Sequence, residues 1–306
     1  MFVGGSVARS VARLNGVPLR YEVAGSGDLV VLVMGTASSG RVWKLHQVPA
    51  LVAAGYRVAT FDSRGVTADA GAAGATARAA TPDAAADAVI TDAVTTVTIE
   101  DMVGDAAALI EHLGGGPARV VGTSLGARVA QELALARPDL VRQVVAMAAH
   151  ARLDPLQRTL TRGEELLFDK AVELPAEYRA AVTAVLNLSP ATLRDESSVT
   201  DWLDVFEVAG APTTAGGRAE LAVSSRLTDR RAAYRAVSVP TLVVAFADDV
   251  MIPPYLSREV ADAIPGARYA EVPAAGHFGY LERPDEVNRL LLEFFATSVS
   301  GGRPGA

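Results

Sequence analysis

A serine flanked by glycines is the first feature of this chain that could do chemistry. It lies in Gly122-Thr123-Ser124-Leu125-Gly126, between a segment expected to form a strand (119–123) and one expected to form a helix (125–136). A tight strand-to-helix turn crowds the backbone on both sides of its centre, and glycines relieve that crowding. Such a turn would hold the Ser124 hydroxyl exposed at a helix N-terminus, as a nucleophile requires. The alternative is a glycine-rich turn with an incidental serine.

A nucleophilic serine needs a neighbouring base, because its hydroxyl is a poor nucleophile at neutral pH. Among four histidines, His277 is the candidate. It follows an expected strand and would lie at the carboxyl edge of the sheet, where the sites of open α/β sheets form. The base in turn needs a carboxylate that fixes its tautomer and stabilises the imidazolium. Asp248 and Asp249 both close the expected strand 241–247, and position alone allows either of them to serve.

Three further residues are candidates for contact with a substrate: His150, Trp202 and Phe206. His150 follows an expected strand, and a structural role is an equal alternative for it. Trp202 and Phe206 belong to a set of apolar residues that could line a pocket, although packing among helices would explain them equally well. The remaining histidines, His46 and His112, lie in expected helices and are interpreted as surface or packing residues.

Strands and helices alternate along most of the chain, which predicts an α/β fold with a mostly parallel central sheet and helices on both faces. Local signals predict a hairpin turn at Asn15-Gly16, a helix from Trp43 to Ala54 and a capping box at Thr98 and Asp101. Between residues 152 and 235 the alternation stops, and several expected helices follow one another. We interpret this segment as an inserted helical cap on a core formed by residues 1–151 and 236–306. The stretch 66–97 has few bulky apolar residues, so it is expected to be less ordered than the core.

Composition narrows the classes of protein that fit. The 306 residues carry a formal net charge of −7, which argues against nucleic acid or an anionic membrane as the main partner. There is no cysteine, so disulfides and thiolate catalysis are excluded. No apolar stretch approaches the length of a membrane span, and the N-terminus lacks the pattern of a signal peptide. We therefore expect a cytoplasmic protein, and no motif predicts a metal or a cofactor.

Taken together, these motifs resemble the α/β-hydrolase superfamily. The resemblance covers nearly all of the chain outside the insertion and the stretch 66–97. It is strongest to small esterases and cofactor-free haloperoxidases with a helical cap, and to hydrolases that accompany antibiotic biosynthesis. It implies that the acid is Asp249, because Pro253 follows four residues later, as is usual in the family. It also implies an oxyanion hole formed by the backbone N–H groups of Thr36 and Leu125.

Three departures from the family pattern stand out. Met34-Gly35 replaces the frequent His-Gly, and the histidine that is lost is usually structural. Phe246 occupies the position, three residues before the acid, where glycine is usual; its bulk could shift the acid to Asp248. The loop after the turn at Asp62 is unusually long.

The sequence thus predicts a serine hydrolase that cleaves an ester or thioester of a small to medium hydrophobic substrate through an acyl-enzyme. The acyl group could be free or linked to coenzyme A or a carrier, and a monomer or homodimer is expected. The first alternative is a biosynthetic triad enzyme that performs cyclisation, acyl release or perhydrolysis. The second is a ligand-binding protein without catalysis, against which the intact set of Ser124, His277 and Asp249 argues.

Overall fold

The computed structural model describes residues 8–64, 96–209 and 214–297. Most of the stretch predicted to be less ordered, 66–97, lies outside these ranges. None of the helices within the described ranges is long and apolar enough to cross a membrane.

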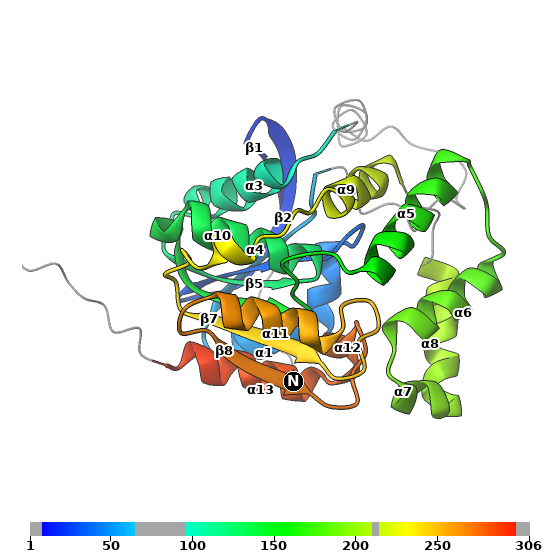
Figure 1. The fold of residues 1–306 in the computed structure, drawn as a ribbon. Helices are drawn as coiled ribbons and strands as arrows, with labels where there is room; N and C mark the ends of the chain where they lie inside the picture. Colours follow the sequence, from blue (N-terminus) through cyan, green and yellow to red (C-terminus); the bar gives the residue numbers. More distant parts are fainter. Residues whose placement is uncertain (1–7, 65–95, 210–213, 298–306) are drawn as a thin grey trace, which may run out of the picture.

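One eight-stranded sheet forms the centre of the molecule, and its neighbours run in the order β1-β2-β4-β3-β5-β6-β7-β8 (Figure 1). β2 pairs antiparallel with both β1 and β4, and all remaining pairs are parallel, as the alternation of elements predicts. The strands are β1 (Ala8–Leu14), β2 (Val17–Gly25), β3 (Leu29–Val33), β4 (Arg57–Phe61), β5 (Ala118–Thr123), β6 (Val141–Met147), β7 (Thr241–Phe246) and β8 (Arg268–Val272).

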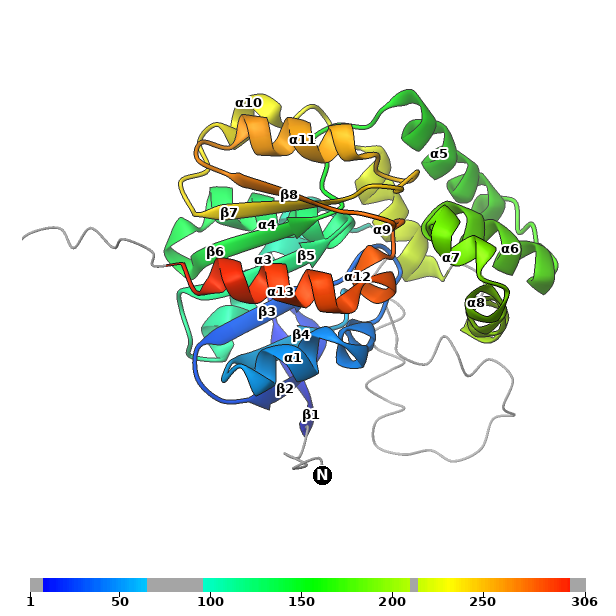
Figure 2. The same ribbon diagram turned by 90° about the horizontal axis from the view of Figure 1, so that it is seen from below.

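Helices cover both faces of the sheet, with α3 and α4 on one face and α1 and α13 on the other (Figures 1 and 2). Because successive residues of a strand point to opposite faces, β3 supplies Val31 and Val33 to one core and Val30 and Leu32 to the other. The helices of the two α/β portions are η1 (Gly40–Leu45), α1 (Gln47–Ala53), α3 (Ile99–His112), α4 (Leu125–Ala136), η2 (Pro138–Leu140), α11 (Pro254–Ala263), α12 (Gly279–Glu282) and α13 (Pro284–Phe295).

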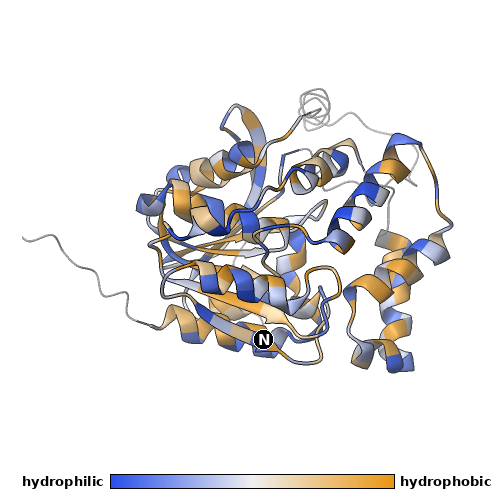
Figure 3. Cartoon of the chain, in the orientation of Figure 1, coloured by the Kyte–Doolittle hydropathy of each residue, from blue (hydrophilic) through white to orange (hydrophobic). Residues whose placement is uncertain are grey.

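Local signals explain where several of these elements begin and end. The turn Asn15-Gly16 has φ values of 45° and 80°, the left-handed conformations that a two-residue hairpin requires. Thr98 and Asp101 form the predicted capping box of α3, in which each side chain accepts the other residue's backbone N–H. Hydrophilic and hydrophobic residues alternate along the covering helices (Figure 3), as expected for helices with one buried face.

One predicted helix is wrong. The sequence predicts a continuous helix from Trp43 to Ala54, but the segment divides into the 3-10 helix η1 and the α-helix α1. Pro49 lies in the first turn of α1, where it removes a backbone donor and fixes φ. A proline is tolerated at the start of a helix but not in its interior, so the α-helix begins just before Pro49.

Between β6 and β7 the chain forms six helices in the described residues: α5 (Pro155–Asp169), α6 (Ala176–Asn187), α7 (Pro190–Arg194), α8 (Glu196–Ala209), α9 (Ala215–Ser225) and α10 (Arg231–Tyr234). The group α6, α7 and α8 lies to one side of the sheet in both views and has a small apolar cluster of its own. α9 differs, because its residues Ala219 and Val223 belong to the main core. The insertion therefore combines an outlying helical group with a helix that packs on the α/β core.

Candidate active site

Ser124 occupies a strained turn between β5 and α4. Its φ of 55° and ψ of −120° are unusual for a residue with a side chain. A Cβ on Gly122 would lie 2.1 Å from the Gly126 carbonyl oxygen, and one on Gly126 would lie 2.2 Å from the Val33 carbonyl oxygen. Glycine is thus required on both sides of the serine for steric reasons. The two glycines that drew attention in the sequence are the residues that make this turn possible.

His277 and Asp249 are in direct contact. Nδ1 of His277 lies 2.8 Å from Oδ2 of Asp249, and both side chains are buried. The second oxygen of Asp249, Oδ1, accepts the backbone N–H groups of Met251 and Ile252 at 2.8 Å each, which fixes the carboxylate. The structure therefore brings Asp249, and not Asp248, against the histidine.

Phe246 does not disturb this arrangement. Its ring is fully buried against Gly279, where an added Cβ would lie 2.3 Å from the ring atom Cδ1. Because position 279 is a glycine, which has no side chain, there is space for the bulky ring at position 246. The register of the loop that holds Asp249 is consequently retained.

The three residues follow β5, β7 and β8, whose carboxyl ends lie at one edge of the sheet. Ser124 is half-buried, and its hydroxyl makes no hydrogen bond to any described residue, including His277. Hydrogen bonds between a nucleophile and its base are often loose without substrate. The geometry shows an oriented histidine beside an unpaired serine at the same edge.

The loop between β3 and η1 approaches Ser124 closely. A Cβ on Gly35 would lie 3.3 Å from the Cβ of Ser124. Beyond it, Ala37 has a left-handed φ of 56°, and the Ser38 N–H closes a turn on the Gly35 carbonyl at 3.3 Å. Thr36 therefore lies within a turn that packs on Ser124, and Leu125 begins α4 directly after that serine. Both N–H groups are unpaired among the residues that the structure describes, as required of oxyanion donors.

Glu220 of α9 is a buried carboxyl that the sequence analysis missed. It is fully buried, and its Oε2 accepts the Ala37 N–H at 2.5 Å. Burial raises the pKa of Glu220 to about 7, although the Ala37 N–H and the Ser63 hydroxyl lower it. A signal was present in the sequence, because Glu220 stands between Ala219 and Leu221 within the buried stripe of α9. A lone carboxylate within such a stripe indicates a specific role.

Glu164 of α5 is a second missed carboxyl, and it lies near the histidine. Burial raises the pKa of its side chain, and the proximity of His277 opposes that effect. Glu164 forms no hydrogen bond or ion pair within the described ranges of the chain. A half-buried carboxyl with no partner, close to His277, could interact with a polar group of a substrate.

His150 is buried next to the same site. Burial, followed by the charges of Arg128 and His277, lowers the pKa of its imidazole to about 3, so the ring is neutral at physiological pH. Its Nδ1 has no hydrogen-bond partner among the described residues. The structure places His150 close to His277, while contact with a substrate stays a prediction.

Trp202 and Phe206 of α8 pack together, with ring centroids 5.3 Å apart. Both also lie near Phe278, the residue after His277, at 6.5 Å and 6.1 Å between ring centroids. The predicted pocket residues thus form an aromatic contact between the insertion and the loop that carries the histidine. Their contact with a substrate stays a prediction.

Glu282 strengthens the same junction between the insertion and the histidine loop. Its Oε2 accepts the Gly276 N–H at 2.6 Å, and its Oε1 accepts the Ser189 hydroxyl at 2.8 Å. In addition, the Phe278 N–H donates to the Asn187 carbonyl at 3.0 Å. The loop around His277 is therefore held by the α6–α7 corner of the insertion.

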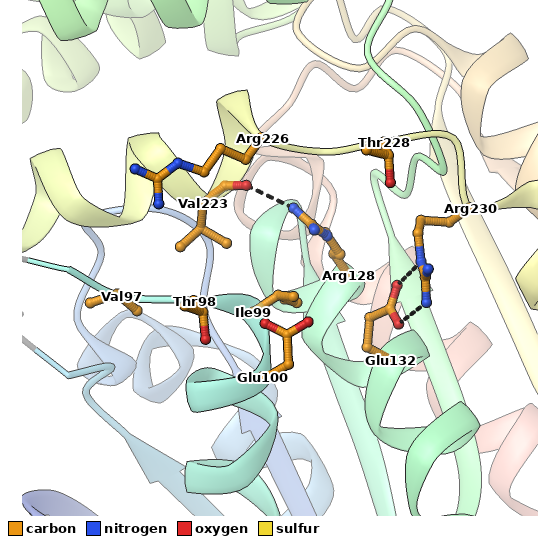
Figure 4. Close-up of a pocket in the computed structure, with 10 residues that line it drawn as sticks. All are labelled: Val97, Thr98, Ile99, Glu100, Arg128, Glu132, Val223, Arg226, Thr228 and Arg230. Atoms are coloured by element: carbon orange, nitrogen blue, oxygen red, sulfur yellow. Dashed lines mark hydrogen bonds and ion pairs between the residues drawn. The ribbon is translucent and has the colours of Figure 1, made fainter.

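A cavity of about 260 Å³ lies beside α4, between α3 and α9 (Figure 4). Its lining includes Arg128, whose Nη1 donates to the Val223 carbonyl, and the ion pair of Arg230 with Glu132. Ser124, His277 and Asp249 do not line it. Because none of these three residues lines the cavity, we assign the chemistry to the sheet edge and not to this cavity.

Comparison with known proteins supports the fold. The model of the alpha/beta hydrolase fold family matches residues 28–284. A Mycobacterium tuberculosis protein with the provisional name non-heme bromoperoxidase BpoC is 43% identical over 281 residues, which cover 92% of this chain and 98% of that protein. The crystal structure of BpoC superposes with a TM-score of 0.81 at 44% identity, over 91% of this chain and 95% of that one. An Azorhizobium caulinodans protein provisionally named carbamate hydrolase RutD is 29% identical, over 90% of this chain and 94% of its own length.

Proposed function

Because the chain belongs to the α/β-hydrolase fold family, we propose that it is a serine hydrolase for an ester or thioester of a small to medium hydrophobic substrate. The observation that carries the proposal is the 2.8 Å contact between Asp249 Oδ2 and His277 Nδ1, at the sheet edge where Ser124 is unpaired. A carboxylate at Nδ1 holds the proton on that nitrogen. Nε2 is then left free to accept the proton of a serine hydroxyl.

The reaction proceeds through an acyl-enzyme. Oγ of Ser124 attacks the carbonyl carbon while its proton passes to Nε2 of His277. The N–H groups of Thr36 and Leu125 stabilise the oxyanion that forms. Collapse of this intermediate breaks the bond to the alcohol or thiol, which leaves with the proton from His277. Water then attacks the acyl-enzyme, gives a proton to His277, and releases the carboxylic acid and the free serine.

Labelling with a fluorophosphonate tests the proposal, because this reagent modifies serines that are activated by a base. Wild-type protein should be labelled stoichiometrically at Ser124, as located by peptide mass spectrometry. Ser124→Ala should lose the label, and its turnover of a p-nitrophenyl ester should fall by about 10⁶-fold if the three residues act as one unit. Labelling at another serine, or unchanged turnover in Ser124→Ala, would contradict the assignment.

Perhydrolysis is a second candidate activity, and the similarity to a protein named as a non-heme bromoperoxidase favours it. In this reaction, hydrogen peroxide and not water attacks the acyl-enzyme, so that a peracid leaves. The two activities share Ser124, His277 and Asp249 and differ only in the final nucleophile. Parallel assays with an ester, a thioester, and acetate plus hydrogen peroxide would separate them. Formation of peracetic acid at a rate comparable to ester hydrolysis would favour perhydrolysis.

A further inference from the structure

The Glu220 carboxyl of α9 is bound to the loop that follows β3, next to Ser124. Its Oε2 accepts the Ala37 N–H at 2.5 Å, and the Ser63 hydroxyl is close enough to lower its pKa, while its Oε1 makes no hydrogen bond of normal geometry to the described residues. A buried carboxyl with unused hydrogen-bonding capacity is costly to maintain. A carboxyl here therefore indicates a requirement imposed by the loop.

The loop has a conformation that needs support. Ala37 is left-handed, with φ of 56°, although it has a side chain and is not a glycine. Asp62 holds the far side of the loop, since its Oδ1 accepts the Ser39 hydroxyl at 2.7 Å and the Gly40 N–H at 2.9 Å. On the side next to Ser124, Glu220 is the described side chain that accepts a hydrogen bond from the backbone of the Gly35–Ser38 turn.

We infer that Glu220 is a positioning residue for the oxyanion hole. By accepting the Ala37 N–H, it fixes the preceding peptide so that the Thr36 N–H faces the oxygen of the acyl group on Ser124. Glu220 itself touches no reacting atom. It acts through the backbone of Ala37, which adjoins Thr36. This inference rests on the proposed function, because it assigns Thr36 N–H as an oxyanion donor.

The role predicts different effects for replacements that keep or remove the acceptor. Glu220→Gln retains an oxygen at the same distance along the side chain and should keep the loop in place. Glu220→Asp shortens the side chain by one methylene, which withdraws the acceptor from Ala37 while it preserves the charge. Glu220→Ala removes the acceptor altogether. The order of activity should therefore be wild type and Gln above Asp and Ala, whereas a purely electrostatic role would place Asp above Gln.

The test is steady-state hydrolysis of one p-nitrophenyl ester by the full-length variants, together with the rate of fluorophosphonate labelling. Removal of an oxyanion donor costs about 10² to 10³ in kcat, so its misplacement should cost about 10- to 100-fold in the Asp and Ala variants. KM should change by less than about threefold, since the interaction belongs to the transition state. Labelling should slow in parallel, because the phosphoryl oxygen occupies the same hole.

Glu165→Ala is the matched control. Glu165 is also a buried carboxyl near α9, but it pairs with Arg218 at 3.2 Å and accepts the Ser225 hydroxyl at 2.9 Å, away from the loop. The Glu165→Ala variant should have a lower midpoint of thermal unfolding, without a loss of kcat in the folded protein. Thermal midpoints for every variant separate misfolding from a change in the site, and Glu220→Asp and Glu220→Gln test the role even if Glu220→Ala does not fold.

Equal kcat for wild type, Glu220→Asp and Glu220→Gln, with normal labelling at Ser124, would overturn the inference and leave the proposed function intact. Loss of kcat in Glu220→Gln as large as that in Glu220→Asp would also overturn it. Absence of labelling at Ser124 in the wild type would instead contradict the proposed function itself. The expected result is the rescue of kcat by Gln alone.

Discussion

Asp249 directs one carboxylate oxygen at Nδ1 of His277, at 2.8 Å, and commits the other to the backbone of its own loop. The carboxylate is thereby fixed in orientation and almost completely buried. Asp248, its neighbour, is half-buried, and its side chain has no hydrogen bond within the described residues; only its backbone N–H is held, by the Ala275 carbonyl. Two adjacent aspartates thus differ in the contact that catalysis would need.

Replacement of each aspartate by asparagine should separate their roles. Asp249→Asn keeps the shape but removes the negative charge that stabilises the imidazolium, and it allows the wrong tautomer of His277. A comparable change in a serine-histidine-aspartate triad costs about 10⁴ in turnover, and we expect a loss of that order. Asp248→Asn should cost about tenfold at most, because it leaves the charge next to His277 in place. Both variants are to be compared on one ester, with circular dichroism as the control for folding.

The opposite ranking would show that the acid is Asp248 and that the contact seen with Asp249 is structural. A loss confined to Asp249→Asn would support its assignment as the acid. If both variants kept the activity of the wild type, neither carboxylate would assist His277.

His150 should make the protein sensitive to acid. Its pKa is lowered to about 3 from the ordinary 6.5, so below pH 6.5 the unfolded chain binds a proton that the folded protein does not. Stability therefore falls as the pH drops through this window, by roughly 2 kcal/mol between pH 6.5 and pH 5. His150→Phe, which cannot titrate, should abolish that loss. Urea unfolding of wild type and variant at about pH 5 and pH 8 measures it.

Glu220 acts in the opposite sense in part of this range, since its raised pKa of about 7 makes the folded state bind the extra proton. The comparison of wild type with His150→Phe removes this contribution, because Glu220 is present in both proteins. His112→Phe, at an exposed histidine, is the control for loss of a histidine as such. An unchanged acid dependence in His150→Phe would contradict the assignment of the effect to His150.

The sequence was most informative where local physical chemistry decides the structure. Three features act over only a few residues and are predictable from the sequence: the glycines on both sides of Ser124, the capping box at Thr98 and the Asn15-Gly16 turn. The break before Pro49 also had a local cause and could have been predicted. Together with the alternation of strands and helices, these local signals predict the α/β core and the turn that holds the serine.

Contacts between segments that are distant in the chain could not be predicted from the sequence patterns alone. Glu220 meets Ala37 across 183 positions. The position of Asp248 and Asp249 after β7 leaves both open, and only the family resemblance favours Asp249; the contact with His277 itself depends on how the loops after β7 and β8 meet. Phe246 drew attention as a departure from the family pattern, but its compensation by Gly279 becomes apparent only in the packed structure. Pairings of this kind arise from tertiary packing, for which no single segment carries a signal.

Trp202 connects the insertion to the histidine loop, which makes it a test of how the insertion affects the substrate. Its ring lies 5.3 Å from that of Phe206 and 6.5 Å from that of Phe278, between centroids. Trp202→Ala should change the relative rates for short and long acyl esters by several-fold. The comparison of kcat/KM across a series of p-nitrophenyl esters checks this prediction. An equal decrease for every chain length, with the fold intact, would indicate that Trp202 only positions the histidine loop.

Gly279 should not tolerate even a methyl group. A Cβ at this position would lie between 2.3 and 2.7 Å from three atoms of the Phe246 ring, which is fully buried and cannot move aside into solvent. Overpacking of this kind destabilises a core by about 1–3 kcal/mol, and we expect a loss of that size for Gly279→Ala in urea unfolding. Because Gly279 begins α12 two residues after His277, kcat should decrease as well.

A double-mutant cycle shows whether the cost arises from this one contact. Phe246→Leu removes the ring and is destabilising by itself, because it leaves a cavity. In the presence of Phe246→Leu, however, Gly279→Ala should cost less than it does in the wild type, since the added methyl group then occupies vacated space. Strict additivity of the two free-energy changes would show that Phe246 and Gly279 are independent. The bulky residue at position 246 would then need another explanation.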